Sequence, residues 1–153
     1  MDQLFIAAPA SAVISLVFAY ILAVKVKNAG EGTERMREIA GYIREGAMAF
    51  LKRQYMTMSV VVAVLFLLVG IFISWLTAVL YLFGALFSVL AGFFGMKVAT
   101  YGNVRTANAA MESGMNSALK VAFRSGAVMG LCVSGLGLFG IGAVVVTFFE
   151  CEF

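Results

Sequence analysis

Long uncharged runs alternate with charged segments along the 153 residues of the chain. The first run, residues 4–24, and the last, residues 125–149, contain 21 and 25 residues. Either run is long enough, as a helix, to cross a hydrocarbon core of about 30 Å. The uncharged run at residues 55–96 would measure about 63 Å as one helix, roughly twice that thickness, so it must fold back. We therefore predict four membrane-spanning helices.

The fold-back is expected at residues 74–78, where Trp75 and Thr77 interrupt the aliphatic residues. Trp75 and Tyr81 also suit the headgroup level, where aromatic side chains gather. The sequence thus predicts an all-α membrane protein, one membrane region over residues 1–153, with helices at about 4–24, 55–74, 78–96 and 125–149.

The basic residues indicate how these helices are oriented. All 11 Lys and Arg residues lie between Lys25 and Arg53 or between Lys97 and Arg124. Because cytoplasmic segments are enriched in Lys and Arg, we expect two basic cytoplasmic loops, with the N- and C-termini outside. Cysteines placed at Thr33 and Asn108 should then react only from the cytoplasmic side.

The first basic segment has its own helical pattern. Its apolar residues recur at helical spacing among charged ones, which predicts an amphipathic helix at about 33–53. Thr33 is a suitable N-cap. Gly41 and Gly46 each cost about 1 kcal/mol relative to Ala in a helix interior, so we expect close packing on their side. The second span should therefore extend into the cytoplasm.

Composition agrees with a lipid environment. Hydrophobic residues make up 63% of the chain and charged residues 12%, and the mean hydropathy is +1.01. Membrane lipid is thus an expected partner. An excess of 11 basic over 8 acidic residues is too small to indicate nucleic-acid binding. With no His, the cysteines Cys132 and Cys151 predict neither a metal site nor a disulfide framework.

The sequence offers few groups for catalysis. All four predicted spans lack Asp, Glu, Lys, Arg and His, which ion pumps use inside the membrane. The glutamates of the basic segments are scattered, whereas magnesium-phosphate chemistry needs clustered carboxylates. We therefore assign no catalytic, cofactor-binding or metal-binding residue. Arg105 and Arg124 are expected to orient loops or neighbouring helices.

Small residues recur at intervals of four in the last two spans. One set is Gly84, Ser88 and Gly92, the other is Gly126, Gly130 and Ser134, and a second smooth face carries Gly135, Gly137, Gly140 and Gly142. Such faces let helices approach closely. They either pack these four helices together or receive further helices that the chain does not contain. Ser88 and Ser134 are interpreted as helix-packing residues.

Three stretches resemble membrane-bound pyrophosphatases: GTERMREIAGYIREGAMAFLKRQY (residues 32–55), GMKVATYGNVRTANAA (95–110) and ALKVAFRSGAVMGL (118–131). The resemblance implies an enzyme that hydrolyses pyrophosphate in the cytoplasm, using magnesium and in some members potassium. Hydrolysis would drive protons or sodium ions outward. The family forms homodimers in which the first four helices belong to an outer ring, while the catalytic residues lie on later helices.

The resemblance therefore implies an N-terminal fragment of a multi-pass pump, inactive by itself, from a prokaryotic plasma membrane. It would act with the remaining helices of the full-length pump. The alternative is a small noncatalytic four-helix membrane subunit that scaffolds or assembles a complex.

Overall fold

Four long helices make up the part of the protein that the structure describes. The computed structural model describes the backbone of residues 2–150 and the side chains of residues 8–145. The helices are α1 (Asp2–Lys27), α2 (Glu34–Phe72), α3 (Trp75–Ser113) and α4 (Met115–Glu150). All four are long and apolar enough to cross a membrane, which confirms the predicted all-α, four-helix architecture. Cys151 lies outside the described residues.

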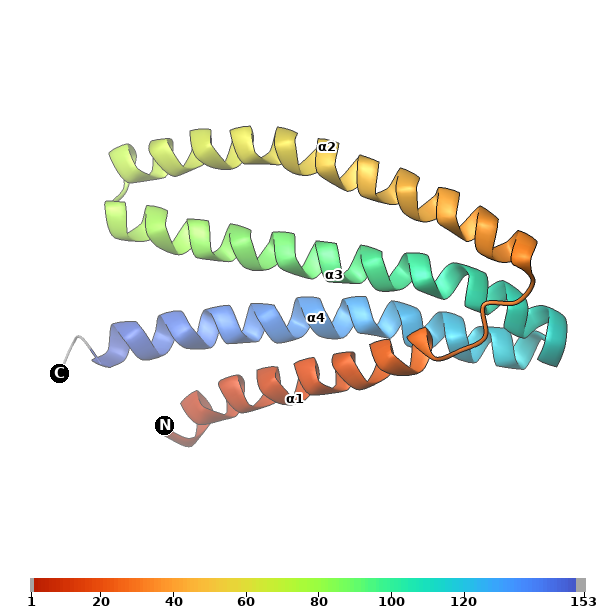
Figure 1. Cartoon of the computed structure of the whole chain (residues 1–153). Helices are drawn as coiled ribbons and strands as arrows, with labels where there is room; N and C mark the ends of the chain where they lie inside the picture. The colour runs from red at the N-terminus through yellow and green to blue at the C-terminus, as the bar shows by residue number, and fades with distance from the viewer. Residues whose placement is uncertain (1, 151–153) are drawn as a thin grey trace.

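The helices lie side by side in the order α2, α3, α4, α1 (Figure 1). Helix α4 packs against both α3 and α1, and α1 also touches α3, whereas α2 packs against α3 alone. The α2–α3 turn lies at the same end of the bundle as the ends of α1 and α4 nearest the termini, and the other two connections lie at the opposite end (Figure 1). Most of the surface of α2 is therefore without a neighbour in the described chain.

Helix α2 joins two elements that the sequence separates. The amphipathic helix expected at 33–53 and the span expected at 55–74 form one continuous helix, so the second span extends into the charged segment as predicted. Thr33 is the N-cap, and its side chain accepts a hydrogen bond from the Met36 amide at 3.4 Å. The close packing expected at Gly41 and Gly46 is absent, because a Cβ on either would meet nothing within 4 Å.

The turn between α2 and α3 is compact. Ser74 is the N-cap of α3 and accepts a hydrogen bond from the Thr77 amide at 3.2 Å. Helix α3 therefore begins at Trp75, three residues before the expected position. The Trp75 ring lies over Gly70, where a Cβ would come within 3.0 Å of it. Glycine at this position allows the aromatic ring to fold back onto α2.

The second basic segment was expected to be a loop between residues 96 and 125, and this was wrong. Helix α3 continues to Ser113 and α4 begins at Met115, so only Gly114 separates them. Gly114 has a φ of 79°, a conformation that glycine adopts without steric cost. The loss of hydrophobicity reported the move from lipid to water, and helices exist in both solvents.

Small buried residues form the centre of the bundle. Ala19 on α1, Ala91 on α3, and Val128 and Cys132 on α4 form one buried cluster. Close to it, a Cβ on Gly135 would come within 3.2 Å of the Ala12 carbonyl oxygen. Helices α1 and α4 therefore approach closely, as expected where small residues replace bulky ones.

Candidate functional site

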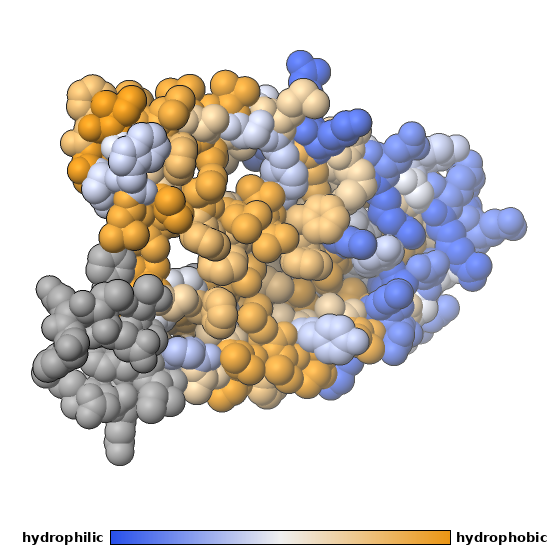
Figure 2. Space-filling model, turned by 60° about the vertical axis from the view of Figure 1, so that its left-hand side comes forward, coloured by the Kyte–Doolittle hydropathy of each residue, from blue (hydrophilic) through white to orange (hydrophobic). Residues whose placement is uncertain are grey.

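Polar residues gather at one end of the bundle, whereas the rest of the visible surface is mostly hydrophobic (Figure 2). At the polar end, residues 28–33 connect α1 to α2 and contact α3. The most buried charged side chain of this region is Arg105, on α3, which is only 4% exposed. Burying a guanidinium is costly unless its donors find acceptors, so its partners define this site.

Arg105 donates to four acceptors. Its Nε donates to the Ala29 carbonyl at 3.0 Å, its Nη1 to the Tyr101 carbonyl at 2.9 Å, and its Nη2 to the Lys27 carbonyl at 2.9 Å. Nη2 also donates to Oε1 of Glu31 at 2.7 Å. Lys27 is the last residue of α1, where helical carbonyls lack partners in the helix itself, and Ala29 follows two residues later in the connection. Arg105 thereby caps α1 from α3.

A second arginine approaches the same carboxylate. Arg44 on α2 has its Nη2 4.0 Å from Oε1 of Glu31, and its guanidinium carbon lies 4.9 Å from the centre of the Tyr101 ring. The guanidinium carbon of Arg105 is 5.6 Å from the same ring. Such distances allow cation–π attraction. We call Glu31, Arg44, Tyr101 and Arg105 the arginine cluster, and it joins the α1–α2 connection to both α2 and α3.

Asn108 extends this contact one turn further along α3. It is 4% exposed, and its Nδ2 donates to the Gly30 carbonyl at 3.4 Å. Gly32 adopts a φ of 75°, and a Cβ there would come within 2.6 Å of Asn108 Oδ1. The connection therefore needs glycine at position 32. The connection covers the side chain of Asn108, whereas Thr33 is exposed, so Thr33 is the more accessible of the two positions named for cysteine labelling.

The two arginines singled out in the sequence differ. Arg105 orients the α1–α2 connection, as predicted. The Arg124 side chain is exposed and has no hydrogen bond or ion pair within the described part of the chain. Sequence reasoning missed Glu31 and Arg44 as partners of Arg105. The four-residue spacing from Tyr101 to Arg105 was the local signal available, but no spacing within one helix relates α3 to Glu31.

The arrangement does not fit a magnesium site. Among the residues that the structure describes, no three of His, Cys, Asp or Glu gather closely enough to hold a metal ion. The Glu31 carboxylate is already bound to Arg105. Magnesium in phosphate chemistry is held by carboxylates together with substrate oxygens. Within the described residues, the arginine cluster joins helices to one another.

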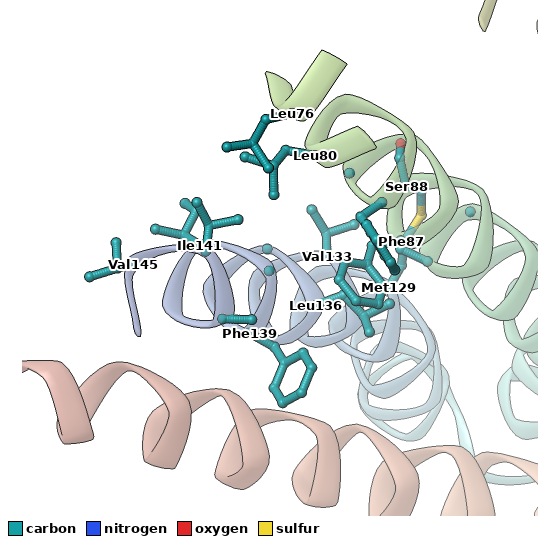
Figure 3. A pocket seen from close by; sticks show the side chains of 18 residues that line it. Leu76, Leu80, Phe87, Ser88, Met129, Val133, Leu136, Phe139, Ile141 and Val145 are labelled. Atoms are coloured by element: carbon teal, nitrogen blue, oxygen red, sulfur yellow. The ribbon is translucent and has the colours of Figure 1, made fainter. Parts of the chain in front are cut away.

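Small residues on α3 and α4 contribute to an open apolar groove between these helices. An apolar groove of about 980 Å³ runs between α3 and α4 (Figure 3), with Leu76 and Leu80 on one side and Val133 and Ile141 on the other. Ser88 lies along this groove as well. The groove is open to the surroundings of the bundle, and lipid chains or further helices can fill it.

Some glycines pack the four helices together, and others lie on faces open to further helices. A Cβ on Gly140 would meet Phe87, and one on Gly142 would meet Pro9, so these glycines pack the four helices together. A Cβ on Gly84, Gly126 or Gly130 would meet nothing within 4 Å. Their faces are unpartnered among the described residues. Ser134 is exposed and its hydroxyl donates to the Gly130 carbonyl of its own helix at 2.8 Å.

Comparison with known families identifies the chain. The family described as "Inorganic H+ pyrophosphatase" matches residues 13–152, which include all of the arginine cluster. The chain belongs to this family. With four helices long and apolar enough to cross a membrane, the chain is a multi-pass membrane protein of this family.

Individual membrane pyrophosphatases agree with this assignment. A "K(+)-stimulated pyrophosphate-energized sodium pump" of Thermotoga maritima is 44% identical over 136 residues, 88% of this chain and 19% of its own. A "K(+)-insensitive pyrophosphate-energized proton pump" of Methanosarcina mazei is 40% identical over 154 residues, 99% of this chain and 23% of its own. The chain thus spans about a fifth of the length of these relatives.

Proposed function

We propose that the chain forms the N-terminal, outer-ring part of a pump that couples pyrophosphate hydrolysis to outward transport of protons or sodium ions. The family match over residues 13–152 carries this proposal. Its relatives include pumps named for sodium and pumps named for protons. Four helices that can cross a membrane provide the expected framework.

The polar end of the bundle is proposed to face the cytoplasm. The basic residues lie on the parts of the four helices nearest this end, and the α2–α3 turn and the ends of α1 and α4 nearest the termini lie at the opposite end. Positive residues favour the cytoplasmic side of a membrane. The termini are then outside, lipid surrounds the apolar faces, and the membrane is proposed to be a prokaryotic plasma membrane.

The chemistry is proposed to lie on the rest of the pump. Magnesium pyrophosphate needs several carboxylates, and the described residues provide no such cluster. The remaining helices would hold magnesium, the substrate and the ion pathway, and would form the homodimer. One relative is named as stimulated by K(+) and another as insensitive to it. Where potassium is used, the remaining helices would bind it.

Within such a pump, these four helices serve as support. Arg105 holds the end of α1 to α3 through carbonyl oxygens and Glu31. Because Arg105 donates to acceptors within the protein, the arginine cluster would keep the cytoplasmic ends of three helices in register without taking part in hydrolysis.

The proposal is tested with the chain alone and with a chimera in which it replaces the matching fifth of the Thermotoga maritima pump. In liposomes, the chain alone should insert but release no phosphate from magnesium pyrophosphate and move no ions. The chimera should do both. Turnover by the chain alone, after contaminating soluble pyrophosphatase is removed, would place a catalytic site on these helices. A chimera that folds but lacks both activities would favour the noncatalytic scaffold instead.

A further inference from the structure

An apolar stripe runs along the charged half of α2. Ile39, Ile43, Gly46 and Phe50 follow one another at intervals of four, three and four residues, which places them on one face of the helix. The exposed fractions of Ile39, Ile43 and Phe50 are 45%, 42% and 59%. This apolar stripe, defined by these four residues, stands among the arginines and glutamates of residues 34–53.

Lipid cannot cover Ile39 and Ile43, which form the part of the apolar stripe farthest from the uncharged run. The uncharged part of α2 begins at Tyr55, and at 1.5 Å per residue Ile43 and Ile39 lie about 18 and 24 Å beyond it. The headgroup layer on each side of a bilayer is only about 5–8 Å thick. Tilting the helix shortens both distances, but each still exceeds the thickness of the headgroup layer. Ile39 and Ile43 therefore stand in water in the described chain.

No described segment of the chain covers the apolar stripe. Helix α2 packs against α3 alone, and in this half of the helix its buried residues are Ala40 and Leu51 on another face. A Cβ on Gly46 would meet nothing within 4 Å. A glycine in an exposed helix interior costs about 1 kcal/mol relative to Ala. Gly46 thus leaves a shallow site between Ile43 and Phe50 where another backbone can approach.

We propose that the apolar stripe is a docking surface for a cytoplasmic segment of the same polypeptide, from the part of the full-length pump that follows this region. The inference rests on the proposed function. The chain accounts for about a fifth of its relatives' length, so most of a pump subunit is available to cover the stripe. Exposed apolar patches in water indicate protein contacts.

The chemistry of the docking segment follows from the surface. It presents an apolar helix face or extended apolar segment, with a small residue opposite Gly46. Arg53 lies three residues beyond Phe50, and its exposed guanidinium has no hydrogen bond or ion pair within the described range. An acidic residue at the membrane-proximal end of the docking segment would complement Arg53.

Site-specific photo-cross-linking in the full-length chimera tests this inference. The photoreactive amino acid p-benzoylphenylalanine replaces Ile43 in one sample and Glu45 in another. Glu45 is the matched control because it is exposed on the same helix, two residues away and outside the apolar stripe. We expect the Ile43 probe to link, several-fold more than the Glu45 probe, to a peptide following the equivalent of residue 153 in the same subunit. Mass spectrometry identifies the linked peptide.

Links from Ile43 to a second subunit, links to lipid, or equal yields from both positions would overturn the proposal. If the probe at Ile43 prevents folding, the probe at Phe50 replaces one exposed aromatic residue by another and is judged by the same outcomes. Hydrolysis and transport are measured on the unsubstituted chimera. Loss of both activities would count against the proposed pump. An active chimera with no intramolecular link would count against the docking surface alone.

Discussion

Arg105 and Glu31 are joined by a 2.7 Å contact between Nη2 and Oε1, which connects α3 to the segment between α1 and α2. The two side chains differ in burial, with 4% of the arginine and 33% of the carboxylate exposed. The buried guanidinium therefore needs protein acceptors for its hydrogen bonds, whereas the carboxylate can also form hydrogen bonds with water. Removing the arginine also leaves the carbonyls of Lys27 and Ala29 without their side-chain donor.

Arg105→Gln should destabilise the bundle by about 1–3 kcal/mol, because it removes the side-chain donor of the Lys27 and Ala29 carbonyls. Unfolding of the purified chain in detergent, followed by helix content, measures the change. Arg35→Gln is the control, since the Arg35–Glu38 pair is exposed on both sides and contributes under about 1 kcal/mol. Equal effects of the two substitutions would show that Arg105 is not a structural anchor.

The same substitution should leave substrate affinity nearly unchanged. In the active full-length chimera, Arg105→Gln is expected to keep the KM for magnesium pyrophosphate within a few-fold, because the guanidinium donates to acceptors within the protein. Steady-state phosphate release gives the value. A large increase in KM by a variant that retains its native fold would mean that Arg105 contacts substrate.

Gly102→Ala should destabilise the α3–α4 interface. The added methyl group would collide with the side chain of Ser125, whose hydroxyl donates to the Val98 carbonyl at 3.3 Å. Overpacking of this kind costs about 1–3 kcal/mol. Gly41→Ala is the matched control in a helix with open space, and it should stabilise by up to about 1 kcal/mol. Thermal unfolding of both variants should shift in opposite directions.

Tyr55→Phe should loosen α2 from its only described neighbour. The Tyr55 hydroxyl donates to the Val89 carbonyl of α3 at 3.0 Å, and a hydrogen bond between membrane helices contributes about 1 kcal/mol. Tyr42→Phe removes an exposed hydrogen bond to Glu38 within α2 and should have little effect. Cross-linking between cysteines placed on α2 and α3 would report the loosening, and unchanged cross-linking in Tyr55→Phe would contradict it.

Labelling from the two sides of the membrane tests the orientation. In a chain without its native cysteines, Met115→Cys should react only from the cytoplasm and Ile73→Cys only from outside. The native residues are 71% and 70% exposed. Met115 begins α4 and Ile73 lies in the α2–α3 turn, and these parts of the chain are at opposite ends of the bundle (Figure 1). A cysteine at Asn108 would be a poor reporter because that position is buried. Reaction of Met115→Cys from outside in intact cells would contradict the proposed topology.

The sequence by itself determined the number of membrane-crossing helices and the family. A lipid core demands uncharged runs of a given length, so counting charges along the chain locates the helices without knowledge of their neighbours. The same counting misassigned residues 97–124 as a loop, because charge reports the solvent around a backbone and not its conformation. Thr33 could be named as a cap because capping involves only residues a few positions apart.

Only the tertiary structure decided what each helix face contacts. The cap that Arg105 places on α1 joins residues 76 and 78 positions apart, and no periodicity within α3 specifies such a pair. Glycines at similar spacing likewise separate into packed ones, such as Gly142, and open ones, such as Gly130. Helix periodicity defines a face, but which neighbour meets that face depends on how the four helices are arranged.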